Sequence, residues 1–201
     1  MNMPAALLLL ACAGCASRAA PPRPVAAPDP AYARVHHDWT RELKLYGELE
    51  TKLLLRATWV GPQVRRAAIQ HVAWRAALSV EEHETMQAAT MQAGREAHEI
   101  VFASMRTDTP AGFGAATFGG EADSPWRLRL QVDEEPCALL SVEELEDPDP
   151  VLHVLYPQQN AWSDLWRARF DPTCGQQGTA TLVVSGPQGA GQVTWELAPA
   201  G

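Results

Sequence analysis

Strict alternation of apolar and polar residues in the second half of the chain predicts β-strands there. Trp126 to Val132 (WRLRLQV) alternates without a break, which is typical of a strand with one buried face. Loop residues 186–191 are rich in glycine and predict a hairpin between the last two strands. The further strands that this pattern predicts are Cys137 to Val142, Val151 to Tyr156, Leu165 to Phe170, Thr179 to Ser185 and Gln192 to Leu197.

A spacing of three or four residues between large apolar side chains predicts helices in the first half. It runs from Tyr32 to Val60 and indicates one long helix. Gly61 and Pro62 suit the end of that helix and the first turn of a second one, which we expect to reach about residue 78. The apolar face expected for this second helix is formed by Val64, Ala68, Val72 and Ala76.

A capping box at Ser79 and Glu82 predicts the start of a third helix, because each side chain closes an exposed backbone N–H. Residues 99–106 fit either the end of this helix or a further strand that follows it. The face expected for the third helix is formed by Met86, Ala89, Ala93, Ala97 and Ile100.

Together these patterns predict an α+β protein. An antiparallel helical unit of about three helices spans residues 31–108, and a glycine-rich junction spans residues 109–125. Short strands at roughly ten-residue spacing predict an antiparallel β-sandwich-like unit over residues 126–201. A hydrophobic content of 46% and a charged content of 20% are typical of a globular chain.

The net charge of −8 is unevenly distributed. Residues 31–110 carry ten basic and ten acidic residues, whereas residues 121–201 carry four and thirteen. Phosphate repels such an acidic half, so nucleic acid is excluded as its expected ligand. A basic stretch in the first half has two interpretations. Its side chains either solvate a surface, or form a patch that binds an envelope protein or an anionic envelope polymer. The residues concerned are Lys52, Arg56, Arg65, Arg66 and Arg75.

The opening residues predict an exported chain. The apolar run from Pro4 to Ala11 is too short to span a bilayer but matches the apolar part of a secretory signal. It leads into Leu9-Leu10-Ala11-Cys12 and Ala13-Gly14-Cys15, each of which resembles the lipid-attachment site of a bacterial lipoprotein precursor.

That resemblance implies cleavage of a signal peptide (residues 1–14) and lipidation of the new first residue, Cys15, with Cys12 as the alternative. Cleavage before Cys15 leaves an even pair of cysteines, Cys137 and Cys174, which suits an oxidising compartment. An ordinary signal without a lipid stays open as an alternative. The Ala that follows either cysteine implies, by resemblance to Gram-negative lipoproteins, the outer membrane.

The rest of the segment 15–30 predicts a linker. Five prolines lie between Ser17 and Pro30, with almost no large apolar side chain, so these residues cannot form a core. Extended chain of this kind spans about 3.1 Å per residue, or roughly 40 Å here. Cys137 and Cys174, which are 37 positions apart, are expected to pair as a disulfide worth roughly 4 kcal/mol in the chain-entropy model.

No motif for catalysis, a metal or a nucleotide is complete. His83-Glu84 and His98-Glu99 begin like the zinc-protease helix, but Gln87 and Phe102 replace its second histidine. No serine lies in a nucleophile elbow, and no glycine pattern suits a phosphate loop. We therefore expect no catalytic residue and no cofactor.

Acidic loops allow one binding hypothesis. Carboxylates gathered at one edge of a sandwich can ligate calcium, although the spacing here matches no EF-hand. The candidate ligands are Asp133, Glu135, Asp147 and Asp149.

These observations favour a membrane-anchored envelope lipoprotein that acts as a non-catalytic binding or structural module. A calcium- or lipid-binding β-sandwich, and an envelope enzyme whose site is assembled from distant residues, are the alternatives.

Overall fold

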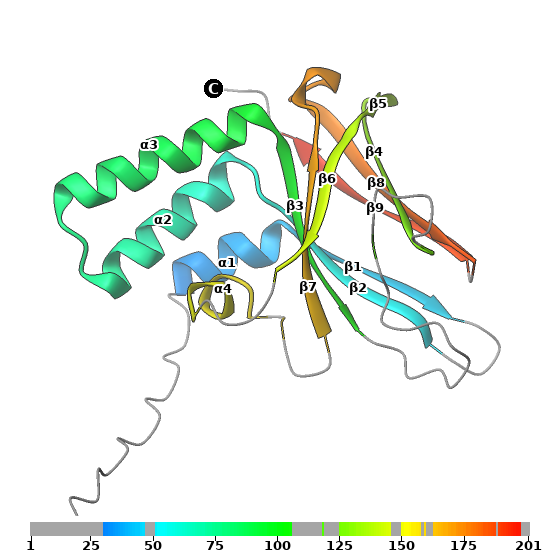
Figure 1. The fold of residues 1–201 in the computed structure, drawn as a ribbon, viewed down its shortest axis with the longest axis horizontal. Helices are drawn as coiled ribbons and strands as arrows, with labels where there is room; N and C mark the ends of the chain where they lie inside the picture. Colours follow the sequence, from blue (N-terminus) through cyan, green and yellow to red (C-terminus); the bar gives the residue numbers. More distant parts are fainter. Residues whose placement is uncertain are drawn as a thin grey trace, which may run out of the picture.

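The computed structural model describes residues 30–46, 51–105, 118, 125–145, 150–157, 159, 163–187 and 189–197, and these residues contain two antiparallel sheets (Figure 1). The first sheet has the strand order β1 (Thr40–Tyr46), β2 (Thr51–Trp59), β3 (His98–Met105), β7 (Ser163–Phe170) and β6 (Leu139–Glu144). The second has the order β5 (Glu135–Cys137), β4 (Arg127–Val132), β8 (Gly178–Gly186) and β9 (Gly189–Leu197).

Helices lie on one side of the first sheet (Figure 1). Two of them, α2 and α3, form a hairpin that extends away from both sheets. The helices of this layer are α1 (Pro30–Asp38), α2 (Pro62–Ala76), α3 (Val80–Glu96) and α4 (Pro150–Leu155), whereas the short 3-10 helix η1 (Pro172–Cys174) lies in the connection between β7 and β8.

The main hydrophobic core contains side chains from both sheets. Strand β4 shows why: its residues alternate strictly between exposed and buried, as the sequence predicts. The same alternation makes Val193, Trp195 and Leu197 buried on β9. Among the largest fully buried side chains of this core are Phe102, Phe170, Leu55, Leu182 and Trp195.

A second core lies between the first sheet and the helices. Val101, Ala103 and Leu165 face it from β3 and β7, opposite to Phe102 and Phe170. Val64 of α2 packs against them. Strands β3 and β7 are therefore buried on both faces.

The prediction of one long helix from Tyr32 to Val60 is wrong. Only α1 is helical, and β1 and β2 follow it as an antiparallel pair with Thr40 opposite Thr58. The stretch also has the period of a strand, because Leu53 and Leu55 are buried on β2 and alternate with half-buried or exposed neighbours. Pairing with β3 and packing on the second sheet favour the strand period over the helical one.

The second and third helices are confirmed, with changed boundaries and faces. Gly61 is not a left-handed cap: it has a φ of −76° and is the N-cap of α2, with Pro62 in the first turn. The capping box of Ser79 and Glu82 is present. The third helix stops at Glu96, so that the strand alternative for the following residues is confirmed as β3.

The expected helix faces are only partly right. On α2, Ile69 and Val64 are buried, whereas Ala76 is exposed. No residue of α3 is buried, and Ala97 and Ile100, expected on its face, lie beyond its end.

In the second half, two strand predictions are wrong. Residues 151–156 form helix α4 and the residue after it, because Leu152, Leu155 and Tyr156 recur at helical spacing on the second core. Residues 137–142 are divided between β5 and β6, which belong to different sheets.

The expected division into a helical unit (31–108) packed on a β-sandwich-like unit (126–201) is also wrong. The first of these segments contributes β1, β2 and β3 to a sheet whose other strands, β7 and β6, come from the second. The glycine-rich junction, 109–125, lies outside the described residues except for positions 118 and 125.

The expected disulfide is confirmed. Cys137, at the end of β5, is bonded to Cys174 in η1, with their Cα atoms 5.1 Å apart. The bond joins β5, at the edge of the second sheet, to the connection between β7 and β8. This connection runs from the first sheet, which contains β7, to the second, which contains β8.

A buried ion pair joins the helical hairpin to the first sheet. Arg65 Nη2 of α2 lies 2.9 Å from Glu99 Oε2 of β3, and their side chains are 6% and 14% exposed. Arg65 also donates to the carbonyl of Thr90 on α3 and passes so close to Gly94 that a Cβ there would lie 2.7 Å from its Nε. Glu99 Oε1 in turn lies 3.5 Å from Nε of Arg167 on β7.

We predict that Glu99→Gln lowers the free energy of unfolding by about 3 kcal/mol, because it leaves the buried Arg65 guanidinium without its full counter-charge. Urea unfolding at neutral pH measures this. Glu42→Gln is the control, since Glu42 forms an exposed pair with Arg56, and such pairs contribute less than about 1 kcal/mol. Equal losses in the two variants would contradict the prediction.

Candidate functional site

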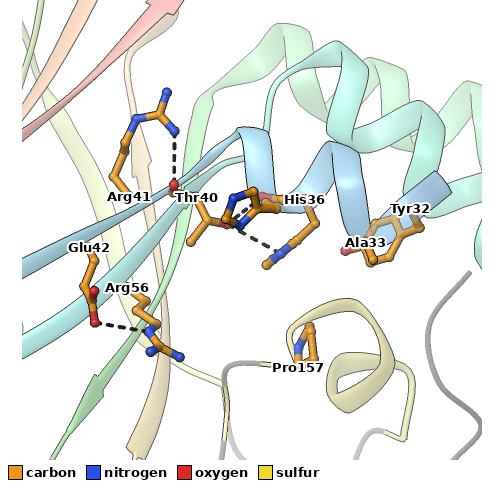
Figure 2. Close-up of a pocket in the computed structure, with 9 residues that line it drawn as sticks. Tyr32, Ala33, His36, Thr40, Arg41, Glu42, Arg56 and Pro157 are labelled. Carbon is orange, nitrogen blue, oxygen red and sulfur yellow. Dashed lines mark hydrogen bonds and ion pairs between the residues drawn. The ribbon is translucent and has the colours of Figure 1, made fainter. Parts of the chain in front are cut away.

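A hollow of about 500 Å³ opens where α1 meets the first two strands. Figure 2 shows its lining residues, which come from α1, from β1 and β2, and from the residue that follows Tyr156 after α4. The lining consists of Tyr32, Ala33, His36, His37, Thr40, Arg41, Glu42, Arg56 and Pro157.

Two threonines fix the inner wall of this hollow. Thr40 Oγ1 donates to the carbonyl of His36 at 2.7 Å and lies 2.8 Å from Thr58 Oγ1, its cross-strand partner. Thr58 Oγ1 is also 3.3 Å from His36 Nε2. The helix end, β1 and β2 are thus joined by hydroxyl groups, and the imidazole of His36 is held against them.

An aromatic cluster closes the floor. Tyr32 stacks on His71 of α2, with ring centroids 5.1 Å apart and planes 13° apart. The ring of Tyr156 meets that of His36 edge-on at 5.9 Å, and the Tyr32 hydroxyl donates to the carbonyl of Leu155. Four rings from α1, α2 and the residue after α4 therefore pack as one group, of which Tyr32 and His36 line the hollow.

Burial shifts the pKa of three of these rings, His36, Tyr32 and Tyr156. It lowers the pKa of His36 to about 4, with a smaller contribution from the charge of His37. Burial likewise raises the pKa of Tyr32 and of Tyr156 above their usual range. At neutral pH His36 therefore presents a neutral imidazole, which is a poor general base.

The rim of the hollow carries the charge. Arg56 Nε lies 3.5 Å from Glu42 Oε1, and Lys44 Nζ lies 3.1 Å from Glu42 Oε2. The hydrogen bond from Lys44, together with the charges of Lys44 and Arg56, lowers the pKa of Glu42. Arg41 donates to the carbonyls of Asp38, Thr40 and Thr194 and braces β1 against β9.

The five predicted basic residues do not form one patch. Lys52 and Arg56 lie on β2, and Arg56 reaches the hollow. Arg65 is buried, so it cannot belong to an exposed surface. Arg66 and Arg75 are exposed on α2.

Of the four carboxylates proposed for calcium, Asp133 lies in the turn between β4 and β5, and Glu135 is the first residue of β5. Asp133 accepts a hydrogen bond from the Thr179 N–H at 2.7 Å. It fills the space over Gly178, where a Cβ would lie 1.9 Å from its Oδ2. Asp133 therefore orders the turn beside the start of β8. Glu135 is exposed.

Asp147 and Asp149, together with Cys12 and Cys15, fall outside the described residues. Among the residues that the structure does describe, no group of three or more His, Cys, Asp or Glu side chains is placed to hold a metal ion. Nor does any described helix combine the length and hydropathy needed to cross a bilayer.

No sequence motif indicated that two histidines contact the ring of Tyr32, which lines the hollow. His36 and His71 are 35 positions apart, yet both contact Tyr32. The only sequence signal was the apolar spacing of Tyr32, Val35 and Trp39, which orients α1. His98 lies elsewhere, with its Nε2 2.6 Å from the carbonyl of Gly175, and its pKa is lowered mainly by burial.

Comparison with known proteins adds no identity. No protein-family model and no curated protein sequence matches the chain. A crystal structure of a protein of unknown function from Burkholderia pseudomallei is similar at a TM-score of 0.37 and 12% identity, over 83% of each chain. At that TM-score the likeness carries no argument about this chain.

We predict that His36 makes the fold acid-sensitive. Its pKa is about 4 in the folded protein and about 6.5 in the unfolded chain, so the unfolded state binds more protons between these values and stability falls as the pH falls through them. Between pH 7 and pH 4.5, the free energy of unfolding, measured with urea, is expected to fall in both proteins. We expect this fall to be smaller by roughly 2 kcal/mol in His36→Gln than in the wild type.

The exposed neighbour provides the matched control, since His37→Gln is expected to keep nearly the full acid loss. His98 and the carboxyl groups whose pKa values are lowered contribute equally in all three proteins. If His36→Gln and the wild type lost the same stability on acidification, the burial of His36 as a neutral group would be refuted.

Proposed function

We propose that this protein is a membrane-anchored lipoprotein of the cell envelope, whose folded part is a β-sandwich-like, non-catalytic binding module. The observation that carries the proposal is the disulfide between Cys137 and Cys174. Disulfides persist in oxidising compartments such as the periplasm and are rare in the cytosol. The bond therefore supports export, which the lipoprotein-like opening also predicts.

The disulfide also supports the choice of lipidated cysteine. With Cys137 and Cys174 paired, cleavage before Cys15 removes Cys12 and leaves only the lipidated residue. Cleavage before Cys12 would leave Cys15 as an unpaired thiol outside the cytosol. Attachment through Cys15, followed by the proline-rich linker, then joins the folded part at Pro30.

The chemistry of the hollow favours binding over catalysis. Its buried histidine is a neutral group among hydroxyls and aromatic rings, and burial lowers its pKa well below the working range of a general base. At the polar edge of the hollow lies Arg56. Its carboxylate partner, Glu42, also forms an ion pair with Lys44. We expect an occupant that brings an anionic group to Arg56 and an apolar or aromatic group to the floor.

Such an occupant agrees with the partners predicted from the basic residues, an envelope protein or an anionic envelope polymer. Of those residues, Arg56 is the one that lines the hollow. An acidic side chain of a protein partner and a charged unit of a polymer present the same chemistry to its guanidinium.

Metabolic labelling with a fatty-acid analogue tests the anchor. We expect incorporation in the wild type and in Cys12→Ala, and none in Cys15→Ala, because cleavage before Cys15 makes this residue the acceptor. Gel fluorescence of the purified chains measures it. Absence of label in the wild type would end the lipoprotein proposal.

A photocrosslinking amino acid at position 37, on the exposed part of the hollow, tests the binding site in intact cells. We expect one captured partner, identified by mass spectrometry, and its loss when Arg56→Ala is added. The matched control places the same amino acid at Arg129, which is exposed on β4 of the other sheet. Equal capture at the two positions would contradict the proposal that the hollow binds the partner. Capture that is unchanged by Arg56→Ala would contradict it as well.

A further inference from the structure

The turn of the α2–α3 hairpin exposes an apolar surface. Trp74 and Val80 are 75% and 76% exposed, more than the other exposed large apolar side chains of the described residues. Residues 74–80, which we call the hairpin tip, contain one charged side chain, Arg75. In Figure 1 this turn lies at the end of the hairpin that points away from both sheets.

Local structure holds these side chains outward. Ala77 has a φ of 50° and closes α2 with a hydrogen bond to the carbonyl of Trp74. Two residues later the Ser79–Glu82 capping box starts α3. Because both helix ends are closed within the turn, its backbone is ordered, and Trp74 and Val80 are presented on a firm support.

The hairpin tip lies beside the point where the linker enters the folded part. Tyr32, two residues after the start of α1, stacks on His71 of α2. Trp74 follows His71 by three residues, which is about 4.5 Å along a helix axis. In a chain anchored through its N-terminal segment, the linker, which spans at most roughly 40 Å, is therefore attached to the fold near Trp74.

We propose that the hairpin tip inserts Trp74 and Val80 into the headgroup region of the bilayer that carries the anchor, and so fixes the orientation of the folded part on the membrane. This inference rests on the proposed lipid anchor. Tryptophan is enriched at membrane interfaces, where its ring is partly apolar and its N–H stays hydrated.

The anchor makes such a small contact sufficient. One tryptophan and one valine bury too little area to bind a bilayer alone, but a tethered contact forms at a high effective concentration. Charge plays little part, because Arg75 is followed by the exposed carboxylates of Glu81 and Glu84. The contact is therefore expected on zwitterionic lipid, without anionic headgroups.

Tryptophan quenching on tethered protein tests the contact. The chain with Cys12→Ser, Cys15→Ser and an N-terminal hexahistidine tag is bound to phosphatidylcholine vesicles that contain nickel-chelating lipid. Their acyl chains are brominated near the headgroup, and identical vesicles without bromine are the reference. The emission of Trp74 is obtained as the difference between this chain and its Trp74→Phe variant.

The matched control moves the probe to the far end of the molecule. Tyr46, at the end of β1, is 67% exposed and lies away from the hairpin (Figure 1). Tyr46→Trp in the Trp74→Phe background therefore reports any non-specific contact between the tethered protein and the lipid.

We expect bromine to quench the emission of Trp74 and to leave that of Trp at position 46 unchanged. Unquenched emission from Trp74, or equal quenching at both positions, would overturn the inference. Because the nickel tether replaces the native lipid, this result is independent of fatty-acid labelling. A failed anchor and a failed hairpin contact are thus distinguished.

Discussion

Strand β3 must be covered on both faces, and the rest of the structure depends on this constraint. From Ile100 to Ser104 every residue is buried, so alternate side chains need an apolar partner on opposite sides. The second sheet covers Ile100 and Phe102, and the helices cover Val101 and Ala103. Removal of either layer would uncover the centre of the first sheet. Exposure of a large apolar side chain there costs roughly 1.5–3 kcal/mol.

The same strand carries the polar link between the layers. Glu99 lies at its half-buried position and receives the guanidinium groups of Arg65 from α2 and Arg167 from β7. A buried pair of this kind contributes little net free energy but penalises any arrangement that separates the charges. Placement of the helical hairpin on the sheet is thus specified by charge as well as by apolar packing.

The helical layer brings the functional features together. The hollow forms where α1 ends and β1 begins, over rings that α1, α2 and the end of α4 contribute. The proposed anchor joins at the start of α1, and the hairpin tip lies one helical turn beyond the ring that stacks on Tyr32. In this arrangement the β-rich side of the molecule extends away from the proposed membrane contact (Figure 1).

Local sequence alone determined the capping box at Ser79, the strict alternation of β4 and the even pair Cys137 and Cys174, because each is a short-range pattern or a parity. Tertiary structure decided what local patterns left ambiguous. Residues 40–59 satisfy helical and strand periods alike, and pairing with β3 selected the strand. The contact of both His36 and His71 with Tyr32 is invisible in sequence, because it depends on how α1 packs against α2, and strands β1 and β2 separate these helices along the chain.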